Sequence, residues 1–272
     1  MDFRQLLINS IPFEEADSFF VRARQSVDTI VSTGVTTVEE MLNILGDTRF
    51  DTELRLQIAA FTTWLQCKPA IKPLIHVATS EAEDVSLRRA AMVSLAILDR
   101  RKAFPVLKRL CINNPNPAIR ESAIAAFTVA PSKRAFNAVV QVIAQEKNPV
   151  VKGQAIRVVS SIPQSDKELA FELFLSLFVD SEENPSVRAY AMEGLGNLRD
   201  KRALDTVIQN LGNEFTQIRC MSAFSLGSLG DKTHIPLLEL MATDEAIFET
   251  WGTVAESAAA AIAEILQRYS WS

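Results

Sequence analysis

One short pattern returns six times along the chain at almost constant spacing. It consists of an apolar residue, a basic residue, two variable residues and a small or apolar residue, as in Val187, Arg188 and Ala191. The basic residues lie 33, 32, 32, 36 and 31 positions apart, and they are Arg55, Arg88, Arg120, Lys152, Arg188 and Arg219. A period of this length is typical of an architecture built by stacking one supersecondary unit on the next.

Each unit carries two helical patterns. In the fifth unit, Val187, Ala191, Leu195 and Leu198 are spaced four, four and three residues apart, which places them on one face of a helix. A second apolar stripe follows over 203–211. A helical hairpin of ~32 residues would leave both stripes in water if it stood alone. The sequence therefore predicts an all-α solenoid in which each hairpin buries its apolar faces against its neighbours.

Two columns of the repeat predict the core. Small residues three places after the basic position let helices approach closely, and they are Ala91, Ala123, Ala155, Ala191 and Ser222. Larger residues fill the layer between helices, and they are Leu95, Phe127, Val159, Leu195 and Leu226.

Composition and charge restrict the class of protein. Apolar residues make up 48%, so a substantial core can be buried. The net charge is −5 and the pI about 5.3, which counts against a non-specific nucleic-acid binder. Three widely spaced cysteines favour a reducing compartment. The first residues lack the order of a signal peptide, and no apolar run reaches the ~18 residues that span a membrane, so we expect a cytoplasmic protein without membrane contact.

The order VRAYAMEGLGNLRDKRALDTVIQNL, beginning at Val187, resembles a HEAT-type repeat. It is similar in particular to the short HEAT-like repeats of phycobilisome lyases and related bacterial proteins. The resemblance covers roughly 37–241 and is strongest over 185–241. It implies an α-solenoid, a right-handed superhelix of about six helical hairpins. We expect one domain over 1–272, with 1–36 as an N-terminal cap that includes a helix over 13–32, and 242–272 as a C-terminal cap.

The same resemblance implies a structural role for the basic column. In HEAT-like units the basic residue opens the second helix, and an acidic residue follows the next turn. Asp99, Asp200 and Asp231 stand 11 or 12 positions after Arg88, Arg188 and Arg219. We infer a ladder in which each basic side chain bonds turn carbonyls or a neighbouring aspartate, because a guanidinium offers five donors in a flat fork. Phosphate binding is the alternative role of this column.

The sequence offers no catalytic constellation. His76 and His234 stand far from cysteine or acidic residues at metal-ligand spacing, and no phosphate-cradling glycine loop is present. We therefore predict no catalytic residue, no metal and no cofactor, and we leave open whether the chain is an enzyme, with a non-enzyme favoured.

The concave surface of the predicted solenoid is the candidate site. Positions two and five after the basic residue should point into it, and in the last three units they are large and mixed. The predicted partner-contact residues are Gln154, Arg157, Tyr190, Glu193, Met221 and Phe224. The alternative places Met221 and Phe224 in the core.

A basic cluster gathers in the second and third units. Its residues are Arg88, Arg89, Arg100, Arg101, Lys102, Lys108 and Arg109. They are either solvated turns between repeats or a docking patch for an acidic partner. Aromatic residues on which bases could stack are not interleaved with these cations, so nucleic-acid binding is the third and least favoured interpretation of the cluster.

These features favour a non-catalytic scaffold or adaptor that binds a protein on the concave face. The alternative, implied by the resemblance, is a bilin lyase subunit or a chaperone that assembles a chromophore or cofactor, in which case a tetrapyrrole would be handled.

Overall fold

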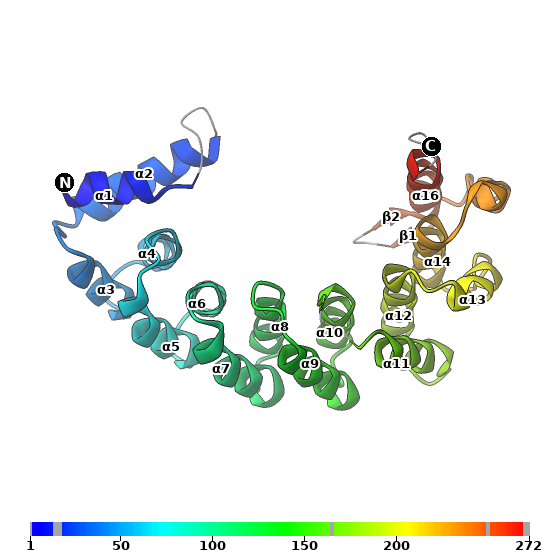
Figure 1. The fold of residues 1–272 in the computed structure, drawn as a ribbon, viewed down its shortest axis with the longest axis horizontal. Helices are drawn as coiled ribbons and strands as arrows, with labels where there is room; N and C mark the ends of the chain where they lie inside the picture. Colours follow the sequence, from blue (N-terminus) through cyan, green and yellow to red (C-terminus); the bar gives the residue numbers. More distant parts are fainter. Residues whose placement is uncertain (1, 13–17, 164–165, 249–250, 269–272) are drawn as a thin grey trace. The chain divides into compact units, whose positions relative to one another are not determined.

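The computed structural model describes residues 2–12, 18–163, 166–248 and 251–268. The chain forms two compact units, residues 1–130 and 131–272, called here the N-terminal and C-terminal units. Helices make up nearly all the regular structure of the described residues (Figure 1). The predicted all-α repeat fold is confirmed, whereas the single domain over 1–272 and the hand of the superhelix stay predictions.

The N-terminal unit is a succession of antiparallel helices. Its elements are α1 (Phe3–Ser10), α2 (Ser18–Ser32), α3 (Val38–Gly46), α4 (Thr52–Trp64), the 3-10 turn η1 (Lys68–Ala70), α5 (Ile71–Thr79), α6 (Val85–Leu98), α7 (Arg100–Asn113), α8 (Pro117–Ala125) and η2 (Ala126–Thr128). Helices α4, α6 and α8 form one layer and α3, α5 and α7 the other (Figure 1). The expected helix over 13–32 corresponds to α2, and its residues 13–17 lie outside the described part of the chain.

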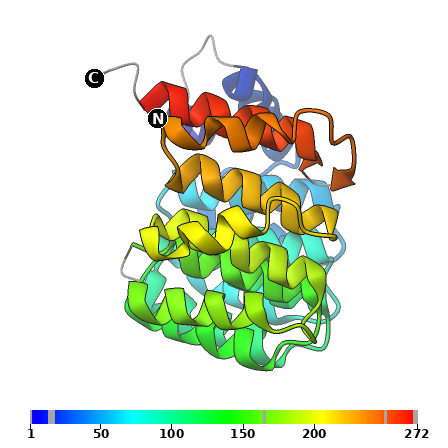
Figure 2. The same cartoon turned by 90° about the vertical axis from the view of Figure 1, so that its right-hand side faces the viewer.

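The C-terminal unit continues the pattern. Its elements are α9 (Lys133–Gln145), α10 (Pro149–Ser161), α11 (Lys167–Val179), α12 (Pro185–Leu198), η3 (Lys201–Ala203), α13 (Leu204–Gln209), α14 (Thr216–Leu229), η4 (Lys232–His234), α15 (Ile235–Glu239), β1 (Ile247–Phe248), β2 (Gly252–Thr253) and α16 (Val254–Arg268). Helices α10, α12, α14 and α16 pack in one layer. Figure 2 looks onto the other layer, in which α11, α13 and α15 follow one another.

Polar side chains cap the start of the second helix in every hairpin except the last, where Phe215 precedes α14. Asn116, Asn148 and Asn184 each precede a proline, and each side-chain oxygen accepts a hydrogen bond from a backbone N–H of the first turn. A capping side chain and a proline at the first helical position both favour helix initiation. The basic residue of the repeat is the fourth residue of α4, α6, α8, α10, α12 and α14.

Both core columns are buried as their spacing predicts. Two glycines of the C-terminal unit mark further close approaches between helices. A Cβ on Gly196 would lie 2.8 Å from the Cα of Ser225, and a Cβ on Gly227 would lie 2.8 Å from the Cα of Ala261. These positions have no room for a methyl group, because real Cβ contacts are essentially never this short. Glycine therefore sets the close spacing of α12, α14 and α16.

The described residues include one departure from a purely helical chain. Strands β1 and β2 form a short antiparallel hairpin in which Ile247 pairs with Thr253 and Phe248 pairs with Gly252. Gly252 has a φ of +80°, a conformation that favours glycine. The hairpin lies between α15 and α16 in the chain and, in Figure 1, on the side of α14 opposite α13. It brings two aromatic residues onto the C-terminal unit.

Candidate functional site

Each basic residue of the repeat bonds a backbone carbonyl or a carboxylate within the fold. Arg55 donates from Nε to the carbonyl of Leu45 at 3.0 Å, and its two terminal nitrogens bond both oxygens of Glu83 at 2.8 and 2.5 Å. Both side chains are almost completely buried. Arg55 thus links the end of α3 to the turn that precedes α6.

The other rungs repeat this geometry in part. Arg88 and Arg188 donate to the carbonyls of Ala78 and Phe178, ten residues earlier, at 3.2 and 2.9 Å. Three rungs make the remaining contacts: Lys152 pairs with Glu183 at 2.6 Å, Arg219 pairs with Asp244 at 2.7 Å, and Arg120 donates to the carbonyls of Asn114 and Pro115. These contacts use the cations within the fold, so the geometry favours the structural role over phosphate binding.

Arg88 has an incomplete rung. Its Nη2 is buried without a hydrogen-bond partner. Glu83, which pairs with Arg55, is the residue before the cap of α6. The equivalent residue before the cap of α8 is Pro115, which has no side-chain oxygen to pair with Arg88. Burial lowers the pKa of Arg88 because it disfavours the charged form.

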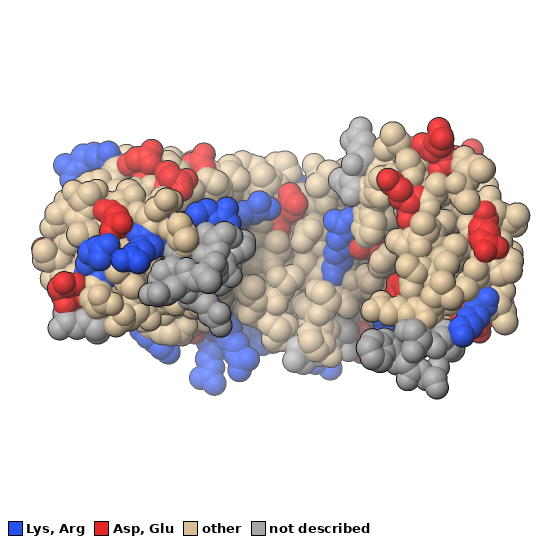
Figure 3. Space-filling model, turned by 90° about the horizontal axis from the view of Figure 1, so that it is seen from above, with Lys and Arg blue, Asp and Glu red and all other residues tan. Residues whose placement is uncertain are grey.

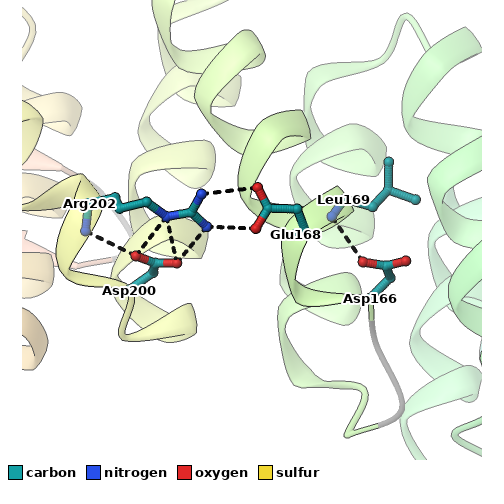
Figure 4. Close-up of polar contacts among 5 residues, drawn as sticks. All are labelled: Asp166, Glu168, Leu169, Asp200 and Arg202. Atoms are coloured by element: carbon teal, nitrogen blue, oxygen red, sulfur yellow. Dashed lines mark hydrogen bonds and ion pairs between the residues drawn. The ribbon is translucent and has the colours of Figure 1, made fainter.

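The predicted role of the three aspartates in the ladder is wrong. Asp99, Asp200 and Asp231 each stand at a helix N-terminus and accept backbone N–H bonds from the first turn. Asp200 also pairs with Arg202 at 2.7 Å, and Arg202 bonds both oxygens of Glu168 (Figure 4). Each of these aspartates is the residue just before a helix, so its carboxylate bonds the first backbone N–H groups of that helix. The basic residues of the ladder bond other groups instead.

Two of the predicted contact residues are buried. Met221 is completely enclosed because α14 packs against α12 on one side and α16 on the other. The prediction that Met221 contacts a partner is therefore wrong. Glu193 is also buried, at 7% exposure, and it accepts a hydrogen bond from Arg157 at 3.1 Å. Its predicted direct contact with a partner is wrong too, because Arg157 covers it.

The other four predicted residues are half-buried on one face of the C-terminal unit: Gln154, Arg157, Tyr190 and Phe224. Gly153 makes room for Tyr190, because a Cβ on that glycine would lie 2.2 Å from the tyrosine ring. The guanidinium of Arg157 lies 4.5 Å from the centroid of the same ring. Tyr190 is thus held between α10 and α12 with part of its surface in solvent.

The hairpin adds residues that the sequence pattern did not indicate. Trp251 packs edge to face on Phe224 with 5.5 Å between ring centroids, and it lies 5.8 Å from the guanidinium of Arg157. Phe248 lies 6.4 Å from Tyr190. Ile247 is 69% exposed beside them in the chain. We call this group the aromatic surface; its members are Gln154, Arg157, Tyr190, Phe224, Ile247, Phe248 and Trp251.

Burial of Glu193 has a consequence for pH. Desolvation raises its pKa above the ordinary 4.5, and the attraction of Arg157 offsets this only in part. The folded state therefore binds the proton more tightly than the unfolded state, so this group's contribution to stability is present at low pH and is lost as pH rises above 4.5.

Replacing Glu193 with glutamine is expected to remove this dependence. The free energy of unfolding of Glu193→Gln should rise relative to that of the original chain between pH 4.5 and neutral pH. Urea denaturation at several pH values measures the difference. A difference that stays constant with pH would contradict the burial of an unfavourable charge at this position.

The buried thiols are poorly suited to act as nucleophiles. Burial raises the pKa of Cys67 and Cys220 and raises that of Cys111 to about 12, so the nucleophilic thiolate is disfavoured. His234 bonds Asp231 at the start of η4. Among the described residues, no three His, Cys, Asp or Glu side chains gather as a metal site. Nor is any helix in this part of the chain long and apolar enough to cross a membrane.

Comparison with known proteins supports the repeat. The family model of HEAT repeats matches residues 171–263, which confirms the predicted HEAT-like repeats in this region. No curated protein matches the sequence.

Several solved structures are similar to this chain. One is the complex of CpcE and CpcF of phycocyanin lyase from Nostoc, with 19% identity, coverage of 86% of this chain and 89% of the other, and a TM-score of 0.48. Human deoxyhypusine hydroxylase in complex with glycerol has 13% identity, coverage of 81% and 82%, and a TM-score of 0.39. YibA of E. coli has 16% identity, coverage of 94% and 100%, and a TM-score of 0.43.

Proposed function

We propose that the protein is a non-catalytic scaffold that binds a protein partner through the aromatic surface of its C-terminal unit. The observation that carries this proposal is the packing of Tyr190, Arg157, Trp251 and Phe224 into one half-exposed group. Tyrosine, tryptophan and arginine are the residues most enriched at the energetic centres of protein interfaces. Rings that are already held in place lose little conformational freedom on binding.

The electrostatics of the unit also favour a protein partner. Arg157 forms an ion pair with the buried Glu193, so the surface presents aromatic rings and a cation that is already paired. On the face of the C-terminal unit visible in Figure 3, carboxylates are scattered among uncharged residues and no continuous basic tract is seen. A mixed, largely uncharged surface suits a protein partner better than the phosphates of a nucleic acid.

An exposed aliphatic side chain allows this surface to be tested without disturbing its packing. Ile247→Asp places a charge at the edge of the aromatic surface, where the side chain is 69% exposed. We expect it to weaken partner binding about tenfold or more, since a charge would be desolvated at the interface. Leu240→Asp is the matched control, because Leu240, which follows the last residue of α15, is 80% exposed and is not a member of this surface.

The experiment has two steps. Proteins that copurify with the original chain are identified by mass spectrometry, and each is then purified and titrated calorimetrically against the original chain and the two variants. The proposal requires a partner that binds the original chain and Leu240→Asp equally and Ile247→Asp weakly. Equal affinity for all three chains would place the interface elsewhere. Recovery of a coloured tetrapyrrole with the protein would contradict the scaffold assignment and favour the chromophore-handling alternative.

A further inference from the structure

Helix α7 carries an unusual concentration of positive charge. Its sequence, RRKAFPVLKRLCIN, holds five cations and no acidic residue. The buried residues Ala103, Leu107, Leu110 and Cys111 define its inner stripe. The five cations are exposed on the remaining surface, which we call the basic face: Arg100, Arg101, Lys102, Lys108 and Arg109. The helix belongs to the layer of α3, α5 and α7 in the N-terminal unit (Figure 1).

The basic face is not neutralised within the described part of the chain. None of its five side chains takes part in an ion pair or a side-chain hydrogen bond there. Asp99 lies next to it and attracts Lys102, while its carboxylate accepts hydrogen bonds from the backbone N–H groups of Arg101 and Lys102. The chain as a whole carries −5 and α7 carries +5, so the rest of the chain carries −10. Positive charge is therefore concentrated on α7, although the protein as a whole is acidic.

The position of these cations also works against the helix that carries them. Arg100, Arg101 and Lys102 are its first three residues. The N-terminus of a helix bears a partial positive charge, so cations there are unfavourable and acidic residues are preferred. The three residues thus oppose the stability of α7 and form no ion pair with the described residues, although Lys102 attracts the carboxylate of Asp99. A binding role gives a physical reason for their placement that the folded chain alone does not.

We propose that the basic face docks an acidic segment of a partner protein. Three of its five cations are arginines, whose flat fork matches a carboxylate with two parallel hydrogen bonds. The proposal rests on a different unit and on different residues from the aromatic surface, so it stands independently of the proposed function.

Two observations favour an acidic peptide over a nucleic acid. Phe104 is the one ring of α7, and it is half-buried against Phe127, so the basic face offers no exposed ring on which a base could stack. Arg101 and Lys108 are seven residues apart, which is about 10 Å along a helix. This span is short, whereas a non-specific nucleic-acid binder gains its affinity from many phosphate contacts along the polyanion.

The test uses a fluorescein-labelled glutamate-rich peptide as the probe, with a glutamine version as the neutral control. The binding variant combines Arg101→Gln, Lys102→Gln, Lys108→Gln and Arg109→Gln. The control variant combines Arg24→Gln, Arg49→Gln, Lys147→Gln and Lys167→Gln, which are exposed cations outside α7, Arg49 being paired with Asp47, and which change the net charge equally. Fluorescence anisotropy gives each affinity, and circular dichroism gives each melting temperature.

We expect the original chain and the control variant to bind the glutamate peptide with similar affinity, weakening with salt, and the binding variant to bind about tenfold or more weakly. The binding variant should melt no lower than the original chain, because unfavourable charges at the start of α7 are removed. If it melts lower, its weaker binding no longer tests the basic face. The proposal is then tested on the original chain, which should bind the glutamate peptide more tightly than the glutamine peptide. Equal affinity for the two peptides, equal loss in both variants, or stronger competition by single-stranded DNA or phosphatidylserine vesicles than by unlabelled peptide would each overturn the proposal.

Discussion

Replacing Glu83 with alanine is expected to lower the free energy of unfolding by about 3–5 kcal/mol. Glu83 and Arg55 are joined by two hydrogen bonds of 2.8 and 2.5 Å, and their side chains are 4% and 3% exposed. Without the carboxylate, the buried guanidinium of Arg55 would keep its hydrogen bond to the Leu45 carbonyl and the attraction of Asp47, but it would lose both hydrogen bonds to its paired acid. The loss is measured by urea denaturation of the two proteins at neutral pH.

Two further variants separate the buried pair from a general effect of the turn. Glu81→Ala removes an exposed carboxylate from the same turn, whose attraction for Arg88 should contribute about 1 kcal/mol or less. Removing both charges together, as Arg55→Met with Glu83→Leu, should cost less than Glu83→Ala alone, because no unpaired charge remains. Similar losses in Glu83→Ala and Glu81→Ala would show that the pair is not buried in solution.

The second large effect is expected at Phe174 in α11. Its ring is fully buried against α12, where it fills the space over Gly194. Phe174→Ala should lower the free energy of unfolding by about 3–5 kcal/mol, because both buried apolar surface and close packing are lost. Gly194→Ala in the original chain should cost about 1–3 kcal/mol, since the new Cβ would lie 2.7 Å from the ring.

The two substitutions at this contact should not be additive. In Phe174→Ala the space above Gly194 is open, so adding the Gly194→Ala methyl group should cost less there than in the original chain. Contacting residues commonly show coupling energies of about 0.5–3 kcal/mol. Denaturant titration of the four chains of this cycle measures the coupling, and strict additivity would mean that the ring does not pack over Gly194.

The repeat was predictable because its evidence is local. The stripe of Val187, Ala191 and Leu195 follows from helix geometry within four residues, and the Asn-Pro pairs mark helix starts without reference to the rest of the chain. The basic column was recognisable for the same reason, since a basic residue stands at the same place in each unit, as Arg188 does in α12.

The candidate site was predictable only in part. Positions two and five after the basic residue placed Gln154, Arg157 and Tyr190 on one face, because a stack of equal units keeps the register. The same rule was wrong for Met221, since α16 covers α14 and no repeat position reports what the following element does. Trp251 was missed because it belongs to a hairpin outside the repeat.

The sequence by itself therefore determined the helices, their starts and the hairpin repeat, because these depend on contacts between residues a few positions apart. Only the tertiary structure decided which groups complete the rungs, as when Glu83 meets Arg55 across 28 residues, and which faces stay open. Those outcomes depend on packing between distant segments. Free energy there is gained by burying charges and rings together, and no local periodicity records it.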